Sequence, residues 1–246
     1  MGFTAKEIPL IFYTGLHMIN HAYAFDHCFI SINRLRKRRS SFAVSNWIID
    51  SGAFTELLQH GRYRSSPNEY VDQIRRWQSC GNLEMAVTQD YMCEPFMLQQ
   101  TGLTVAEHQQ LTIQRYDELV KLSPVTIMPV LQGYAVGDYL KHLKMYSNRL
   151  SYGTRVGVGS ICKRNGSPKE IINILQAIKA KRPDLKLHGF GLKLTSLTDT
   201  YIRNLLYSAD SMAWSYAARR NGLNANGLPE ALRFANRIEE MVHEQV

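Results

Sequence analysis

Short apolar segments that each end in polar or glycine residues recur along the chain, and they constrain its fold more than any other feature. Residues 48–52 (IIDSG) run from two isoleucines into a carboxylate, a hydroxyl and a glycine. The same order returns at residues 85–90 (MAVTQD), 128–133 (MPVLQG) and 156–160 (VGVGS). Apolar strand residues become buried, whereas Asp and Gly at a strand's end favour an exposed turn. The pattern therefore predicts buried strands whose carboxyl ends together form a functional rim.

Eight such strands alternate with helices from the third strand onward. We expect the strands at residues 9–16, 28–32, 46–50, 83–90, 125–132, 155–160, 187–193 and 209–215. Ser66, Thr104 and Ser167 each stand three residues before a glutamate, which predicts a capping box at the start of a helix. Further helices are expected at residues 137–150, 199–207 and 228–243. Alternation implies parallel pairing through right-handed crossovers, and eight such units close a barrel.

The length of the chain agrees with that architecture. Its 246 residues suit one α/β domain of the (β/α)8, TIM-type class. No linker, internal repeat or low-complexity tract interrupts the pattern, so we expect a single barrel domain over residues 1–246.

The chain is basic, with 29 lysines and arginines against 21 acidic residues and a formal net charge of +8. This excess favours a polyanionic partner, because clustered cations release the counterions of phosphates, although a soluble protein without such a partner can also be basic. Five cations stand within residues 34–39, namely Arg34, Arg36, Lys37, Arg38 and Arg39. They repel one another and cannot be buried together, so the run is expected to meet either solvent or nucleic-acid phosphates.

The four cysteines, Cys28, Cys80, Cys93 and Cys162, are widely spaced and form no C-x-x-C pair. The sequence therefore predicts free, mostly buried thiols, with neither a zinc site nor a disulfide framework. It has no charged and then apolar leader and no run of 18 apolar residues, so we expect a cytoplasmic protein with no membrane partner.

Asp50 and Asp90 both stand at expected strand ends, where two carboxylates can face one pocket. A pair of carboxylates flanking a glycosidic bond can act as nucleophile and general acid/base. Each Asp can instead cap the turn that follows it. Gln132 offers an amide for the edge of a heterocycle, and glycines at 157 and 159 allow close approach of a planar ligand.

Other residues near the expected rim have a structural interpretation as well as a functional one. His188 is expected to be a core or loop histidine rather than a ligand. Lys193 either meets a phosphate or is solvated, and Trp214 and Tyr216 either stack a base or pack in the core.

Taken together, residues 46–216 resemble the tRNA-guanine transglycosylase superfamily, whose fold is a (β/α)8 barrel. Asp50-Ser51-Gly52-Ala53-Phe54 is similar to its D-S-G-G-[FY]-Q stretch, and 130–133 (VLQG), 157–159 (GVG) and 187–193 (LHGFGLK) are similar to its later motifs. The resemblance implies that Asp50 is catalytic. It also implies a base-binding set of Ser51, Gly52, Asp90, Gln132, Gly133, Gly157, Gly159 and Lys193.

Two departures indicate a particular branch. The superfamily's C-x-C-x-x-C zinc site with a distant histidine is absent from the sequence, so no metal is expected, and the chain is short for an enzyme acting on tRNA. Both features, with residues 155–166 and 208–222, resemble the compact DpdA-type branch of phages and bacterial DNA-modification clusters. That resemblance implies exchange of guanine in DNA for a 7-deazaguanine base such as 7-cyano-7-deazaguanine, without a cofactor, as expected of a base-exchanging glycosyltransferase.

A third departure concerns the nucleophile. The superfamily's G-x-D-x-F-D motif places it three residues after the first Asp, and that position here is Ala213, with Asp210 nearby. Either Asp210 attacks from a shifted strand, or Asp50 attacks and another group moves the proton; we expect Asp50 and Asp210 to form the catalytic pair. Phosphates would meet residues 34–39 together with Lys163, Arg164, Arg219 and Arg220.

Three alternatives stay open from the sequence. The same chemistry can act on tRNA, water can replace the incoming base as in a glycosylase or nucleoside hydrolase, or the barrel can bind nucleic acid without catalysis, as Ala213 allows. The sequence leaves the oligomeric state open.

Overall fold

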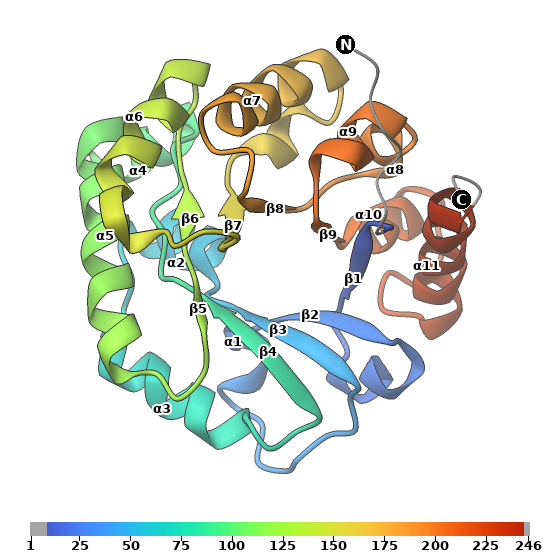
Figure 1. Ribbon diagram of the computed structural model, residues 1–246. Helices are drawn as coiled ribbons and strands as arrows, with labels where there is room; N and C mark the ends of the chain where they lie inside the picture. The colour runs from blue at the N-terminus through green and yellow to red at the C-terminus, as the bar shows by residue number, and fades with distance from the viewer. Residues whose placement is uncertain (1–8, 244–246) are drawn as a thin grey trace.

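The computed structural model describes residues 9–243, within which nine parallel strands are ringed by helices (Figure 1). The strands are β1 (Ile11–Gly15), β2 (His27–Ser31), β3 (Asn46–Asp50), β4 (Asn82–Val87), β5 (Ile127–Met128), β6 (Val130–Leu131), β7 (Arg155–Val158), β8 (Lys186–Gly189) and β9 (Ser208–Ser211). The α-helices are α1 (Ile32–Leu35), α2 (Ala53–His60), α3 (Pro67–Trp77), α4 (Pro95–Thr101), α5 (Val105–Leu122), α6 (Val136–Tyr146), α7 (Pro168–Lys181), α8 (Leu194–Leu197), α9 (Thr200–Leu205), α10 (Ala213–Arg220) and α11 (Leu228–His243). Three 3₁₀ turns are η1 (Ile19–Ala24), η2 (Ser147–Arg149) and η3 (Ile161–Arg164).

The expected fifth strand is present but is divided by Pro129 into β5 and β6. β5 pairs with β4 and β6 pairs with β7, all in parallel register. Proline has no N–H to donate, yet its carbonyl accepts a hydrogen bond from Gly157 N at 2.9 Å, so the ladder continues across it. β5 and β6 thus fill one position of the ring, and the fold is the α/β, TIM-type barrel that the sequence predicts.

Strand ends are where the sequence-based expectation was wrong. The last strand does not extend to residue 215: it ends at Ser211, and Ala213 begins helix α10. The segment 213–220 (AWSYAARR) is rich in alanine and carries two arginines in its last turn, which favours a helix there. β4 and β8 also end three or four residues before the expected positions, because the chain leaves the ladder at the rim.

Two of the three expected capping boxes are confirmed. Ser66 Oγ accepts from Glu69 N at 3.2 Å while Ser66 N donates to Glu69 Oε2 at 2.8 Å, and Thr104 with Glu107 repeats this geometry. Ser167 makes no such bond. The carboxylate of Glu170, which the box would need, lies instead 3.3 Å from the guanidinium of Arg164.

The apolar core has two layers, as a barrel requires. Between strands and outer helices lies a large cluster that includes Trp47, Ile49 and Leu131. Inside the barrel lies a smaller one, formed by Tyr13, Phe29, Ile48, Met85, Val87, Met128 and Val130. Successive strand residues point to opposite faces, so each strand contributes to both layers. No helix within residues 9–243 is long and apolar enough to span a membrane.

Candidate active site

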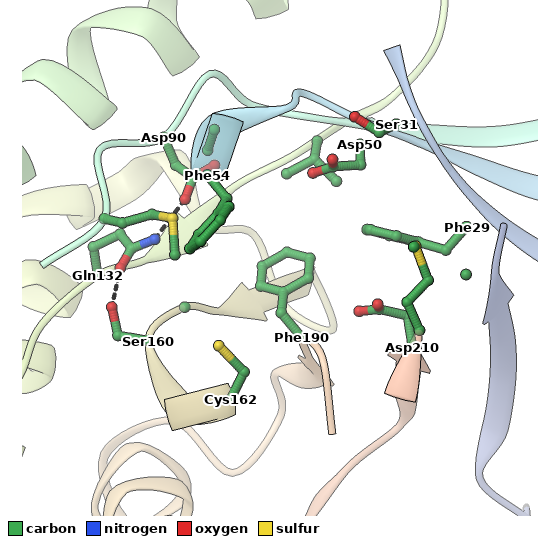
Figure 2. A pocket seen from close by; sticks show the side chains of 16 residues that line it. Phe29, Ser31, Asp50, Phe54, Asp90, Gln132, Ser160, Cys162, Phe190 and Asp210 are labelled. Atoms are coloured by element: carbon green, nitrogen blue, oxygen red, sulfur yellow. Dashed lines mark hydrogen bonds between the residues drawn. The ribbon is translucent and has the colours of Figure 1, made fainter. Parts of the chain in front are cut away.

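A pocket of about 210 Å³ opens at the carboxyl ends of the strands, as the sequence pattern predicts (Figure 2). It receives residues from every position of the ring. Its lining consists of Gly15, Phe29, Ser31, Asp50, Ala53, Phe54, Val87, Asp90, Met92, Gln132, Gly159, Ser160, Cys162, Phe190, Asp210 and Met212. Three carboxylates stand in this mostly apolar lining, and none of the lining residues carries a positive charge.

Asp90 and Gln132 form one side of the pocket. Gln132 Nε2 donates to Asp90 Oδ2 at 2.5 Å, and Gln132 Oε1 accepts from Ser160 Oγ at 3.0 Å (Figure 2). These two bonds fix which end of the amide faces the carboxylate. Burial raises the pKa of Asp90 to about 7, partly opposed by the bond from Gln132. The arrangement presents an acceptor and an amide edge, which suits a planar heterocycle with N–H groups.

The turn after β7 is built closely around Gln132. A Cβ on Gly159 would stand 2.2 Å from Gln132 Nε2, so only glycine fits at this position. The next residue, Ser160, has φ of 60°, a left-handed conformation that is unusual for a non-glycine residue. This turn places the Ser160 hydroxyl against Gln132.

Asp50 ends β3 and receives hydrogen bonds from neutral groups. Gly52 N donates to Asp50 Oδ2 at 3.1 Å, and the Ser31 hydroxyl is a further partner. Burial and the nearby charge of Asp210 raise the pKa of Asp50 to about 6, although these hydrogen bonds oppose the shift. A carboxyl group with such a pKa can exchange protons near neutral pH.

Asp210 lies in β9 and is held through one oxygen. Its Oδ1 accepts from Gly191 N at 3.1 Å and lies 3.3 Å from His188 Nε2. Burial raises the pKa of Asp210 to about 7. Since both donors bind Oδ1, the geometry leaves Oδ2 as the oxygen available to a reacting group.

A buried chain of hydrogen bonds determines which ring nitrogen of His188 carries the proton next to Asp210. Burial, together with the charge of Arg155, lowers the pKa of His188 well below its usual value, so the ring is neutral. Arg155 Nε donates to Ser208 Oγ at 3.1 Å, and Ser208 Oγ lies 2.8 Å from His188 Nδ1. Ionised Asp210 can only accept, so opposite that form the Ser208 hydroxyl donates to His188 Nδ1. The remaining ring proton then sits on Nε2 and points to Asp210.

The order of the strands gives the order of the three carboxylates. Asp90 follows β4, Asp50 ends β3 and Asp210 lies in β9, and the sheet runs β4-β3-β2-β1-β9, so Asp50 lies on the arc between the other two. In addition to burial, the charge of Asp50 raises the pKa of Asp90, and the charge of Asp210 raises that of Asp50. Figure 2 agrees, with Asp90 beside Gln132 at one side of the view and Asp210 at the other. Asp50 therefore lies between the amide-bearing side and Asp210.

Four residues of the expected base-binding set do not line the pocket but belong to the segments around it. Ser51 is buried and donates to Asp90 Oδ1 at 3.4 Å. Gly52, with φ of 78°, turns the chain into α2. Gly133 packs on α6, and Gly157 makes room for the ring of Phe190, which a Cβ would approach to 2.4 Å. None of the four lines the pocket.

Lys193 and Ala213 lie elsewhere, in a second and wider cavity of about 710 Å³. Tyr216 and Arg220 share this cavity with them. Of these two positions only Asp210 lines the first pocket, whereas Ala213, which motif spacing assigns to the nucleophile, lies on α10. Trp214 is a core residue whose Nε1 donates to Gly15 O at 2.8 Å.

The cations of residues 34–39 are not equivalent. Arg36 binds Asn33 Oδ1 and Ser65 Oγ, and Arg38 binds the carbonyls of Ser40 and Ser41. Both guanidinium groups are thus engaged within the protein. Arg34 contacts His17 Nδ1 at 2.8 Å. Lys37 and Arg39 are exposed to solvent.

Four further cations, located after β7 and on α10, were expected to contact phosphates. One of them is buried and three are exposed. Arg164 is buried, donates to Ser160 O at 2.8 Å and to Tyr134 O, and pairs with Glu170. Lys163, Arg219 and Arg220 are exposed.

Sequence reasoning missed several residues of the pocket. Ser31 and Ser160 hold Asp50 and Gln132, and Phe29 and Phe190 form apolar walls. Ser160 was recoverable in part, since it directly follows the glycine pattern. Ser31 and the phenylalanines carry no local signal, because a strand residue becomes a pocket residue only when the barrel closes.

The described residues do not fit a zinc site like that of the superfamily that the sequence resembles. Residues 9–243 contain no group of three or more His, Cys, Asp or Glu side chains placed to hold a metal ion. All four cysteines are free, and burial raises the pKa of the pocket residue Cys162 to about 11.

A TIM-type barrel with buried carboxylates in a pocket at the strands' carboxyl ends defines the class of this protein: it is an α/β barrel with its pocket where barrel enzymes have their active sites. A family model then gives the particular family. The model of DpdA, DeoxyPurine in DNA protein A, matches residues 11–241, so the chain belongs to the DpdA family. This membership supports a role in the modification of deoxypurines in DNA, with DNA as the substrate. No curated protein is significantly similar to the chain in sequence.

Proposed function

We propose that this protein is a DNA-guanine transglycosylase, which replaces guanine in DNA with a 7-deazaguanine base through a covalent sugar–carboxylate intermediate. The observation that carries the proposal is the row of three carboxylates in one pocket without a cation among its lining residues, in a chain of the DpdA family. Base exchange needs one group to recognise the base, one to move a proton and one to hold the sugar.

Asp90 and Gln132 are the base-recognition pair. The carboxylate of Asp90 accepts hydrogen bonds from the N–H groups on the edge of guanine, and it can do the same for 7-deazaguanine, which keeps that edge. The second amide proton of Gln132, not used by Asp90, is available to a carbonyl of the base. The aromatic walls Phe54 and Phe190 cover the faces of the ring.

Asp210 is the nucleophile and Asp50 the acid/base. Oδ2 of Asp210 attacks C1′ of the deoxyribose while the bond from C1′ to the base nitrogen breaks. The leaving guanine takes the electron pair of that bond and a proton from Asp50. In the second half, Asp50 removes a proton from the incoming base, whose nitrogen attacks C1′ and releases Asp210. The position of Asp50 on β3, on the arc of strands between β4 and β9, supports this division.

The test is incubation of the purified chain with DNA and 7-cyano-7-deazaguanine, followed by mass spectrometry of the nucleosides. We expect a deazaguanine deoxynucleoside, and a decrease in rate of about 10³-fold in Asp50→Asn and in Asp210→Asn. The exposed Asp72→Asn is the matched control and should behave as the wild-type chain. With the incoming base omitted, wild-type protein should form a covalent DNA adduct that survives denaturation, and Asp210→Asn should form none.

Three outcomes contradict the proposal. Incorporation into tRNA but not DNA favours the RNA enzyme, and release of guanine without incorporation favours a hydrolase. Binding of DNA with neither product favours a barrel that does not catalyse. An adduct that persists in Asp210→Asn and disappears in Asp50→Asn would reverse the two catalytic assignments.

A further inference from the structure

Four exposed aromatic rings stand on the segments that follow the strands' carboxyl ends. They are Phe54 in α2, Phe96 in α4, Tyr134 after β6 and Tyr216 in α10, exposed by 45%, 38%, 44% and 56%. Exposed large apolar groups that gather on one face indicate a binding surface. We call these four residues the aromatic rim.

A cation lies over each ring of the aromatic rim. Lys163 Nζ is 5.0 Å from the ring centre of Phe54 and 5.2 Å from that of Phe96. Arg164 Cζ is 4.4 Å from the ring of Tyr134, and Lys193 Nζ is 5.6 Å from that of Tyr216. Arg164 is engaged within the protein, whereas Lys163 and Lys193 are exposed and present positive charge beside the rings.

The aromatic rim is continuous with the pocket. Phe54 is both an exposed ring and part of the pocket lining (Figure 2). Tyr216, Lys193 and Arg220 line the second cavity together with Ala213, which directly follows the first-pocket residue Met212 in the chain. A strand of DNA whose target nucleotide enters the pocket therefore passes Phe54, and its neighbouring nucleotides lie on the face that carries the other rings.

We propose that the aromatic rim binds unpaired nucleotides on either side of the target guanosine, so that the protein prefers single-stranded or locally opened DNA. In a duplex the faces of the bases are stacked inside and only phosphates and groove edges are outside, and a phenylalanine ring can hydrogen-bond to neither. Unpaired bases expose their faces, which stack on aromatic rings, while lysines beside the rings contact the phosphates. The inference rests on the proposed function in one respect: it assumes that the target base binds in the pocket.

The chain contains a matched control for this surface. Tyr152 is 91% exposed and lies in the turn before β7, hence at the opposite end of the barrel. No described cation lies over its ring. A substitution there removes an exposed ring without touching the aromatic rim.

The experiment measures binding of a fluorescent oligonucleotide with one guanine, as a single strand, as a full duplex and as a duplex with a short central bubble, at one salt concentration. We expect the single strand and the bubble to bind at least about tenfold more tightly than the duplex. Phe96→Leu and Tyr216→Leu should each weaken single-strand binding about tenfold and leave duplex binding unchanged. Tyr152→Leu should change neither, and thermal melting should show all three variants folded.

Equal affinity for single strand and duplex would overturn the inference, as would wild-type single-strand affinity in both Phe96→Leu and Tyr216→Leu. These measurements need no incoming base and no turnover. A chain that prefers single strands but exchanges no base therefore refutes the proposed function alone. A chain that exchanges base equally fast in both DNA forms, and binds them equally, refutes the aromatic rim alone.

Discussion

The barrel holds carboxylates near both of its ends, and their surroundings differ. Glu84 of β4 lies towards the amino ends of the strands, where Arg155 Nη1 is 3.0 Å away and the Tyr13 hydroxyl donates at 2.7 Å. Asp50, Asp90 and Asp210 at the carboxyl ends receive hydrogen bonds from neutral groups of the described chain. One end has its charge compensated by a cation, and the other does not.

The difference separates structure from chemistry. A carboxylate that is paired with a neighbouring cation holds strands together without being available for reaction. A buried carboxyl group without a cation has a raised pKa, and the three aspartates accordingly have pKa values of about 6 to 7. The uncompensated carboxyl groups at the carboxyl ends of the strands lower the stability of the fold, but they can both bind and release a proton near neutral pH.

The first prediction tests the compensated end. Glu84→Gln leaves Arg155 buried without its partner, so we expect a loss of roughly 3 kcal/mol in the free energy of unfolding. Urea denaturation measures it, with Asp72→Asn as the control, because that exposed pair with Arg75 contributes little. A loss for Glu84→Gln no larger than for the control would show that the inner pair is not structural.

The second prediction tests the uncompensated end through pH. Asp210 binds its proton more tightly in the folded chain, with a pKa of about 7 against an ordinary value of 3.8, so its ionisation lowers stability as pH rises through this window. Asp210→Asn removes the effect. Its stability should equal that of wild type near pH 4 and exceed it by roughly 4 kcal/mol at pH 8.

The quantity to compare is the difference in the free energy of unfolding between wild type and Asp210→Asn at each pH. This difference cancels the contribution of the buried histidines, which both proteins contain. Thermal or urea unfolding at four pH values gives this difference. If it is constant with pH, or if the asparagine protein is the less stable one at pH 8, Asp210 is not an uncompensated buried acid.

The third and smallest prediction concerns the chain of bonds that links the two ends, from Arg155 through Ser208 and His188 to Asp210. His188→Phe keeps the ring but removes the donor to Asp210, so we expect kcat for base exchange to fall about tenfold with KM for the base unchanged. The acidic side of the pH–rate profile should move to higher pH, because the ionised form of Asp210 loses a donor. His188→Gln, which restores an N–H, should recover part of both; a profile identical to wild type in His188→Phe would contradict this role.

Local sequence patterns predict some of the pocket residues but not all of the structure around them. Asp50, Asp90 and Gln132 were expected at strand ends, and they lie in one pocket because parallel strands bring their carboxyl ends to the same rim. The assignment of the last strand to residues 209–215 was wrong, since helix propensity takes over at Ala213. Arg36 and Arg164, which were expected to contact phosphates, bind Ser65 and Tyr134, residues far from them in sequence that no local pattern indicates.

The order of strands and helices, the barrel class and the positions of the carboxylates follow from the sequence, because apolar periodicity, caps and turn residues act between near neighbours in the chain. The partners of those carboxylates do not. That Glu84 meets Arg155 and that Asp210 meets His188 depends on the register of strands far apart in sequence. A pKa depends on burial and on which charge lies close in space, so closure of the barrel determined which acids are structural and which can react.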